Sequence, residues 1–331
     1  MTLFLADDNS WITFNVPAFK ALFWPNTFNG LAYGAIYSLI AMGYTLVYGV
    51  LRLINFAHSE VFISGAYAVF FTLSFLGFGP FIPSISLLSL IGDLLLACIA
   101  AMVVSGIVAV LLERVAYRPL RKRNAPPLVF LITAIGASFT IQYLIEWWRG
   151  ATAEQSVIMF KPQAIFTVFG ADIDNQQLTI FFAAIVLMIV VDQFISRTRF
   201  GRGIRAVAQD PDTATLMGVN KERVIMLTFL IGGLLAGAAS LFYIMRVPSG
   251  VQYNGGFNLG IQAFAAAVLG GIGNIRGAML GGLLIGLIGN YGQTLLGNSQ
   301  WSAVIAFIAL VVILMFRPTG ILGESLGKAR V

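Results

Sequence analysis

The chain has 331 residues, of which 58% are hydrophobic and 10% are charged, and its mean hydropathy is +0.88. Because an average soluble domain carries about 25% charged residues, this composition excludes a soluble globular protein and indicates an integral membrane protein. The net charge is +6, but eleven of the twenty Lys and Arg residues lie in two loops between apolar runs, a distribution that reflects membrane topology rather than nucleic-acid binding. The single cysteine excludes a disulfide framework or a cysteine zinc site.

The apolar runs predict the fold. A helix needs about 20 mostly apolar residues to cross the hydrocarbon core. The run 61–79 is short, and 261–272 covers about half a span, which is typical of a re-entrant or broken helix. We therefore expect an all-α polytopic bundle of eight or nine transmembrane segments in a membrane domain 28–316, between an N-terminal tail 1–27 and a C-terminal tail 317–331. The runs are 28–50, 61–79, 85–112, 127–147, 178–195, 224–245, 261–272, 277–296 and 300–316.

Short loops rich in Lys and Arg predict the orientation, because such loops stay on the cytoplasmic side. The loops 113–127 and 196–223 hold five and six of these residues, so both are expected in the cytoplasm. The stretch 148–177 is poor in them and is expected outside. The C-terminus is then cytoplasmic, and nine crossings place the N-terminus outside; a re-entrant segment changes that last inference.

The stretch RLINFAHSEVF, residues 52–62, places polar groups between two apolar runs. Asn55, Glu60 and His58, the only histidine, are costly in lipid, where ionisable groups are usually functional. His58 and Glu60 are two residues apart, so they lie on different sides of a regular helix and a direct dyad is not expected. Two interpretations remain open. This segment is a hinge that hydrogen-bonds exposed backbone, or it lines the path of a transported solute.

The second basic loop contains a capped short helix, QDPDTATLMGVN. Asp210 is the predicted N-cap, Pro211 suits the first helical position and Asp212 places negative charge in the first turn. Gly218 is the expected C-terminal stop after about two turns. We expect this helix to expose Ala214, Leu216 and Met217 among polar neighbours. A surface helix packed on its own loop and a helix that inserts into a groove on a soluble partner both fit the pattern.

Glycines recur every four residues near the C-terminus, a spacing that lets helix backbones approach closely. We interpret these positions as helix-packing sites, while smooth surfaces of this kind also allow sliding during transport. The residues are Gly273, Gly277, Gly281, Gly282 and Gly286.

Catalytic and nucleotide-binding motifs are missing from the sequence. It holds no phosphate-binding loop, and one histidine excludes an H-E-x-x-H metalloprotease. A serine hydrolase pairing of His58 with Ser64 has the wrong helical spacing. Carboxylates within the spans are few and lie towards the segment ends, which argues against an ion-coupled carrier. No cofactor or metal is expected on this chain, and an enzymatic role is not expected.

Several long stretches in the same order resemble the permease subunits of ABC importers for branched-chain and neutral amino acids, the LivH type, which has close urea-importing relatives. The resemblance runs from about Phe28 to Gly323. This chain has Ser59 where the family usually has glycine. The matching stretches are NGLAYGAIYSLIAMGYTLVYGVLRLINFAHSEVF, ERVAYRPLR, FGRGIRAVAQDPDTATLMGVN, FAAAVLGGIGNIRGAMLGGLLIG and RPTGILG.

The resemblance implies a multi-pass protein of the bacterial inner membrane that imports an amino acid. It implies four kinds of partner: a second homologous permease, two cytosolic ATPases that hydrolyse ATP, a periplasmic substrate-binding protein and the substrate. Asp212, Thr213, Ala214 and Gly218 are similar to a degenerate form of the E-A-A-x-x-x-G motif of ABC importers, which identifies Asp210–Gly218 as the expected ATPase-coupling helix. Urea or a short amide is the alternative substrate, and an ion-coupled amino-acid carrier is the alternative class of transporter.

Overall fold

The computed structural model describes residues 14–81, 86–154, 157–247, 250–298 and 301–323. The outer parts of the two predicted tails, residues 1–13 and 324–331, lie outside the described residues. Each of the nine apolar runs forms a helix. They are α2 (Phe23–Leu51), α3 (His58–Phe75), α4 (Leu87–Leu112), α6 (Pro127–Arg149), α7 (Asn175–Arg197), α10 (Lys221–Arg246), α11 (Gly255–Gly270), α12 (Ile275–Leu296) and α13 (Ser302–Phe316).

Six helices in the described part of the chain are long and apolar enough to cross a membrane: α2, α4 with its continuation, α6, α7, α10 and α12. α11 and α13 are apolar but shorter, with 16 and 15 residues. The structure therefore supports a polytopic helical bundle with six candidate spans, fewer than the predicted eight or nine.

Shorter elements connect these helices. α1 (Val16–Ala21) precedes α2; a π-helical turn η1 (Glu113–Tyr117) and α5 (Arg118–Lys122) prolong α4; α8 (Arg199–Gln209) and α9 (Pro211–Leu216) lie between α7 and α10. The expected all-α fold is corrected at one place. Strands β1 (Ala164–Val168) and β2 (Ala171–Asp174) form an antiparallel hairpin, whose turn residues Phe169 and Gly170 both have positive φ, as tight hairpin turns require.

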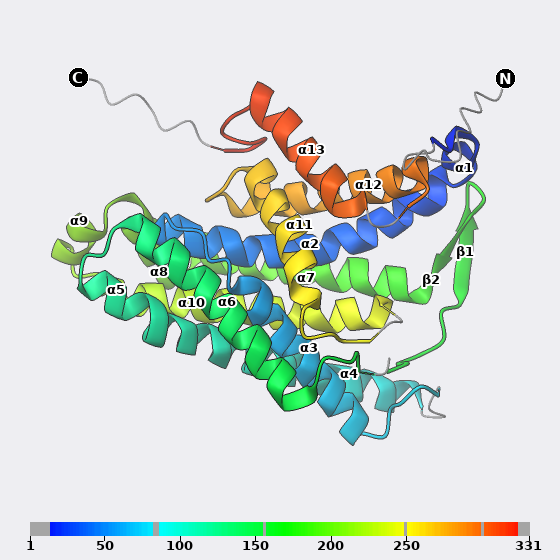
Figure 1. The fold of residues 1–331 in the computed structure, drawn as a ribbon, viewed down its shortest axis with the longest axis horizontal. Helices are drawn as coiled ribbons and strands as arrows, with labels where there is room; N and C mark the ends of the chain where they lie inside the picture. Colours follow the sequence, from blue (N-terminus) through cyan, green and yellow to red (C-terminus); the bar gives the residue numbers. More distant parts are fainter. Residues whose placement is uncertain (1–13, 82–85, 155–156, 248–249, 299–300, 324–331) are drawn as a thin grey trace.

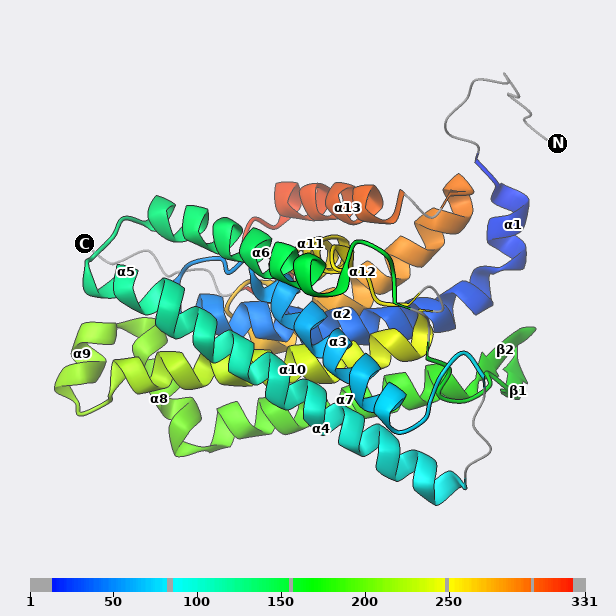
Figure 2. The same ribbon diagram turned by 60° about the horizontal axis from the view of Figure 1, so that its bottom comes forward.

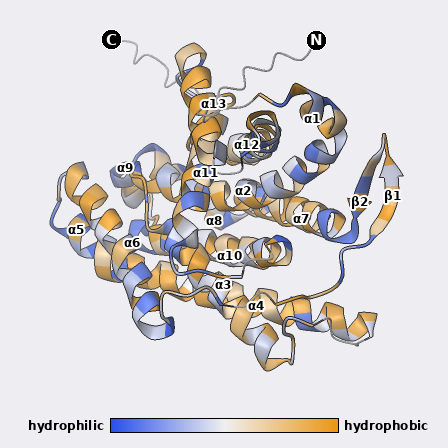
Figure 3. Cartoon of the chain, turned by 45° about the vertical axis from the view of Figure 1, so that its right-hand side comes forward, coloured by the Kyte–Doolittle hydropathy of each residue, from blue (hydrophilic) through white to orange (hydrophobic). Residues whose placement is uncertain are grey.

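The core is built around α2 and α10. In these two helices 83% and 72% of the most apolar window is buried, whereas α6 has the smallest share of the six spans, 11%. α2 packs against α10, α11 and α12, and α4 packs against α3 and α10. α4, α6, α7 and α13 expose many large apolar side chains, which Figure 3 shows as apolar colouring on the outside of the bundle. Such an outer surface is suited to lipid.

Glycines allow α2 and α12 to touch backbone to backbone. A Cβ added to Gly34 of α2 would lie 2.8 Å from Leu283 Cα of α12, and Gly282 and Gly286 of α12 face Ser38 and Gly34 in turn. Four of the five predicted packing glycines, Gly277, Gly281, Gly282 and Gly286, thus lie in close helix contacts.

Gly273 corrects the packing prediction. It precedes α12, has φ of 97° and has nothing within 4 Å of an added Cβ. Its conformation in the turn, rather than contact with a neighbouring helix, favours glycine there.

Most long helices run side by side, so the bundle has two ends (Figure 2). The basic end carries α5, α8, α9 and the loops 113–127 and 196–223; the hairpin end carries α1, β1 and β2. α11 differs, because it lies crosswise to α2 in Figure 1 and is seen end-on in Figure 2. Its first turn abuts α3, where a Cβ on Gly256 would lie 2.8 Å from Ser59 O.

Candidate functional site

The short helix α9 is capped as the sequence predicts. Asp210 Oδ1 accepts hydrogen bonds from the backbone N–H groups of Asp212 and Thr213 at 2.9 and 3.1 Å, and Oδ2 accepts one from the Thr213 hydroxyl at 2.6 Å. These hydrogen bonds, chiefly those from Thr213, lower the pKa of the Asp210 carboxyl. Pro211 occupies the first helical turn, and Gly218 follows the helix with φ of 84°. A helix of six residues is therefore fixed at both ends.

α9 presents an apolar tip at the basic end of the bundle. Leu216 and Met217 are 87% and 81% exposed. The helix ends at Leu216, one residue earlier than expected. Ala214 corrects the prediction of exposure, because it is buried; its carbonyl accepts a hydrogen bond from Val219 N–H at 3.0 Å. The helix thus packs one face on its own loop and leaves Leu216 and Met217 free for a partner.

The segment between α2 and α3 forms a buried corner. α2 ends at Leu51, and Arg52 adopts the left-handed conformation with φ of 55°. Asn55 Oδ1 accepts hydrogen bonds from Ala57 N–H at 3.2 Å and from the Tyr117 hydroxyl at 2.9 Å. Asn55 therefore satisfies backbone that the break between helices exposes and ties the corner to η1.

His58 and Glu60 point to different surroundings, and no hydrogen bond or ion pair joins them in the described part of the chain. The His58 ring packs edge-on against Tyr44 with the ring centroids 4.8 Å apart. It fills space that a side chain on Gly43 would occupy. The predicted absence of a dyad agrees with this geometry, and the imidazole serves as a packing group in the core.

Glu60 faces α6 and is 1% exposed. Its Oε1 accepts long hydrogen bonds from the hydroxyls of Ser59 and Ser138, at 3.4 and 3.3 Å. Its Oε2 is buried and has no hydrogen-bond partner among the described residues. A carboxylate in this position is costly, and His58 Nε2 of the same corner is likewise buried without a hydrogen-bond partner among the described residues.

Ion pairs that the sequence analysis did not anticipate hold the basic end. Arg121 Nη2 lies 2.6 Å from Glu113 Oε1 and 2.8 Å from Glu222 Oε2, and Arg118 Nε lies 3.1 Å from Glu222 Oε2. Glu113 is 1% exposed. The network ties η1 and α5 to the first turn of α10. Lys221, the neighbour of Glu222, pairs with Asp212 of α9 at 3.2 Å.

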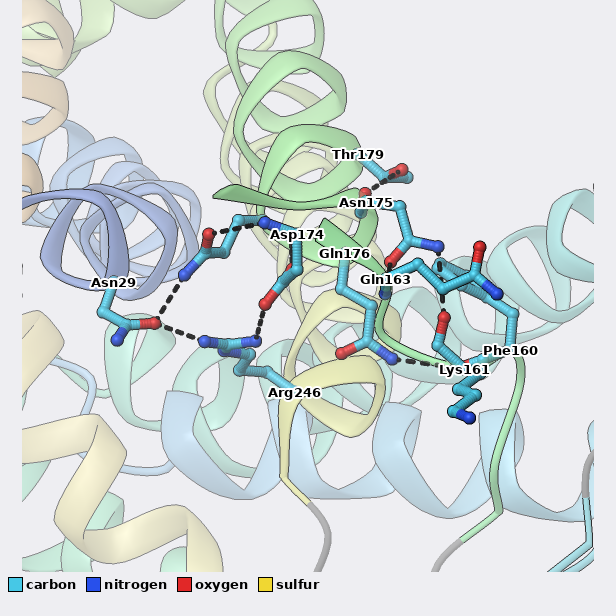
Figure 4. Close-up of polar contacts among 10 residues, drawn as sticks. Asn29, Phe160, Lys161, Gln163, Asp174, Asn175, Gln176, Thr179 and Arg246 are labelled. Carbon is cyan, nitrogen blue, oxygen red and sulfur yellow. Dashed lines mark hydrogen bonds and ion pairs between the residues drawn. The ribbon is translucent and has the colours of Figure 1, made fainter. Parts of the chain in front are cut away.

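A second polar cluster holds the hairpin end (Figure 4). Arg246, at the end of α10, pairs with Asp174 at 2.9 Å and donates a hydrogen bond to the Asn29 side chain of α2. Gln177 also donates to Asn29, at 2.7 Å, and completes a capping box with Asp174 at the start of α7. Asn175 and Gln176 at the start of α7 donate hydrogen bonds to the carbonyls of Lys161 and Phe160, and Asn175 also accepts one from Gln163 N–H. The cluster therefore joins α2, α7, α10 and the hairpin.

The structure brings the corner and the basic loop together. Arg52 Nη2 donates to the carbonyl of Ala208 in α8 at 3.0 Å, only two residues before the N-cap of α9. The packing glycines of α12 lie in other contacts, with α2 and α11. No group of three or more metal-ligating side chains occurs among the described residues.

Comparisons with known proteins identify the family. The family model described as branched-chain amino acid transport system, permease component, matches residues 26–314. The chain belongs to this family. It is 41% identical over 300 residues to the high-affinity branched-chain amino acid transport system permease protein BraD of Pseudomonas aeruginosa, covering 89% of this chain and 94% of that protein. It is 37% identical over 303 residues to LivH of Escherichia coli K12, a permease protein with the same description, covering 90% and 94%.

A more distant relative extends the comparison. The probable branched-chain amino acid transport permease protein LivH of Methanocaldococcus jannaschii is 27% identical over 314 residues, covering 91% of this chain and 92% of the relative. No solved structure gives a significant match. These findings confirm the resemblance seen in the sequence and the predicted class, a permease subunit of an ABC importer and not an enzyme.

Proposed function

We propose that this permease conducts branched-chain or other neutral amino acids into the cell through the bacterial inner membrane, driven by ATP that partner subunits hydrolyse. The relatives named above support the amino-acid substrate over urea or a short amide. The complete importer contains a second permease, two cytosolic ATPases and a periplasmic binding protein. Alternating access moves the solute, and this chain performs no covalent step.

The observation that carries the proposal is the tip of α9. It stands at the basic end, which the Lys and Arg bias of the loops assigns to the cytoplasm together with the C-terminus. Leu216 and Met217 are exposed there on a helix capped at both ends. An apolar pair on a rigid short helix fits a groove on a soluble partner, and we assign the residues from Asp210 to Gly218 to ATPase coupling.

The proposed topology has nine passages, of which one is broken. The helices alternate between the two ends from α2 to α10. Residues 250–255 then approach Ile63 and Tyr243, where they line a cavity of about 140 Å³, and α11 runs crosswise before α12 starts at the basic end. The N-terminus then lies outside. Cysteine labelling of the two ends in sealed vesicles tests this orientation.

Uptake by the whole importer in proteoliposomes tests the function. ATP-dependent uptake of labelled leucine, isoleucine or valine that exceeds uptake of urea and survives an uncoupler is the expected result. Uptake that needs no ATPase and collapses with the uncoupler would instead establish an ion-coupled carrier. Preferential uptake of urea would overturn the substrate assignment but leave the transporter class intact.

A charged residue at the tip of α9 tests the coupling role. Leu216→Asp removes an apolar contact worth about 2 kcal/mol, so association with the ATPase weakens about 30-fold and uptake falls with it. Phe81→Asp is the matched control, because Phe81 is an apolar residue, 83% exposed, outside α9 and its loop. Normal ATPase association in Leu216→Asp would rule out the assigned docking surface.

A further inference from the structure

Polar side chains form a stripe between α3 and α6, within an otherwise apolar pair of helices. Glu60, Ser64 and Tyr67 recur at spacings of four and three on α3, so they share one face. Ser138, Gln142 and Glu146 recur every four residues on α6 and are half-buried. Contact between Ser138 and Glu60 shows that the two faces meet.

Two groups on the α3 side of this stripe are buried without a partner. Glu60 Oε2 and the Tyr67 hydroxyl have no hydrogen-bond partner among the described residues, although the two side chains are only 1% and 3% exposed. Buried polar groups are nearly always hydrogen-bonded, and an unpaired one needs an explanation. Five other buried side-chain atoms among the described residues also lack a hydrogen-bond partner, but these two share one face of α3 and leave polar groups there open to a ligand.

Aromatic contacts close the stripe at both of its ends. Towards the basic end, the Tyr117 ring of η1 lies 6.1 Å from Phe130 of α6. Towards the hairpin end, Phe71 of α3 lies 5.2 Å from Trp148 of α6. The Arg149 guanidinium also lies 5.0 Å from the Phe71 ring. Glu60 and Tyr67 therefore lie between two aromatic contacts.

α6 is the helix whose displacement disturbs the core least. Its buried share is the smallest of the six candidate spans, and it lies on the outside of the bundle beside α3 (Figure 2). A movement of α6 that separated one of these aromatic contacts would open the polar stripe towards that end. Irregular or polar surface at membrane depth is tolerated where it lines such a path.

We propose that α3 and α6 line the route of the solute and that Glu60 binds the ammonium group of the amino acid as it passes. This inference rests on the proposed function. A carboxylate recognises a primary ammonium group through charge-assisted hydrogen bonds, and Oε2 is the free acceptor while Ser59 and Ser138 hold Oε1 in place. The Tyr67 hydroxyl, seven residues along the same face, offers the next polar contact.

The chemistry of the stripe favours this ligand over others. A neutral amino acid carries one ammonium group whatever its side chain, so one carboxylate serves several substrates. Metal binding is not indicated, because the described residues contain no group of three metal-ligating side chains here or elsewhere. The free Oε2 of Glu60 lies on the face of α3 that meets α6, where a ligand between the two helices would find it.

The test compares Glu60→Gln with the wild-type chain in the complete importer, reconstituted with its binding protein and ATPases. The readout is labelled leucine taken up per ATP hydrolysed. Glutamine has nearly the size and shape of glutamate, so this variant removes the charge while it preserves the packing of the corner. Removing one partner of a buried charged contact costs at least about 2 kcal/mol, so this ratio falls at least about 30-fold. Glu60→Asp restores part of it, and Ser138→Ala lowers it less than Glu60→Gln.

Asp93→Asn provides the matched control, because it removes a carboxylate from α4, away from the stripe, and leaves the ratio unchanged. A wild-type ratio in Glu60→Gln overturns the inference, whatever amount of folded complex is recovered. Absence of ATP-driven uptake by the wild-type chain overturns the proposed function and with it this inference. The two failures are therefore distinguishable in one experiment.

Discussion

The two ends of α10 are both tied by ion pairs, but only the network at the basic end includes a carboxylate that is almost fully buried. At the basic end Arg121 joins Glu222 to Glu113, whose side chain is 1% exposed. At the hairpin end Arg246 pairs with Asp174, and both side chains remain nearly one-fifth exposed. The loss of stability when one member of an ion pair is removed depends on the charge that remains. A buried charge without a partner costs far more free energy than one that water can reach.

The two ends of α10 also differ in the elements to which they are linked. The basic end links α10 to α5 and, through Lys221 and Asp212, to α9. The hairpin end links it to α2 and α7 through one arginine. We interpret the first as a fixed joint and the second as a more exchangeable one. The predictions below test this difference.

Replacement of Arg121 should have the largest effect. Arg121→Ala leaves the carboxylate of Glu113 buried and unpaired, and should lower the free energy of unfolding by about 3 kcal/mol. Denaturant unfolding in detergent measures it. Arg123→Ala is the control, because Arg123 is exposed in the same short segment. Addition of Glu113→Gln to Arg121→Ala should restore stability; failure to do so would show that the buried charge is not the cause.

Replacement of Arg246 should cost less. Arg246→Ala removes charged hydrogen bonds to Asp174 and Asn29 and should lower the free energy of unfolding by about 2 kcal/mol. A double-mutant cycle with Asp174→Ala measures the share of the pair itself. Arg149→Ala, which breaks a more exposed pair with Glu154, should cost less still. A loss equal to that of Arg121→Ala would contradict the importance of depth.

The smallest effect is expected at the cap of α9. Asp210→Ala should lower the hydrogen-exchange protection of α9 amides several-fold, whereas Asp210→Asn retains the cap. The lowered pKa of Asp210 means that the cap contributes fully above the ordinary pKa of about 3.9 and is lost as pH falls through the lower, folded value. Protection in the wild type should thus stay constant from about pH 5 to 8. A change in the protection of α9 amides within that pH range would show that a group other than Asp210 titrates there.

Local patterns predicted the helices well, because crossing a membrane and capping a helix are local requirements. All nine apolar runs form helices, and Asp210, Pro211 and Gly218 occupy the predicted capping positions. Even α8, which the sequence analysis treated as loop, carries a local signal. Its buried Ile204 and Val207 are three residues apart, and Thr198 caps it. Two glycines within α8 obscured that signal.

Contacts between distant residues were not predictable in the same way. Arg246 meets Asn29 across 217 positions, and Arg121 meets Glu222 across 101. Nothing in the composition near either arginine identifies such a partner. The hairpin was missed because its strands have only five and four residues, and β1 shows no alternation of apolar and polar residues. The partnerless oxygen of Glu60 also required coordinates, since its residue type alone predicted only a costly group.

The turn between α9 and α10 has a mechanical consequence. Only residues 217–220 separate the two helices, and Lys221 is paired back to Asp212. α10 then runs for 26 residues, or about 39 Å at 1.5 Å per residue. The connection between the exposed tip of α9 and α10 is therefore short and held by an ion pair. Under the proposed coupling role, a force on α9 therefore passes directly to α10, whose far end carries Arg246.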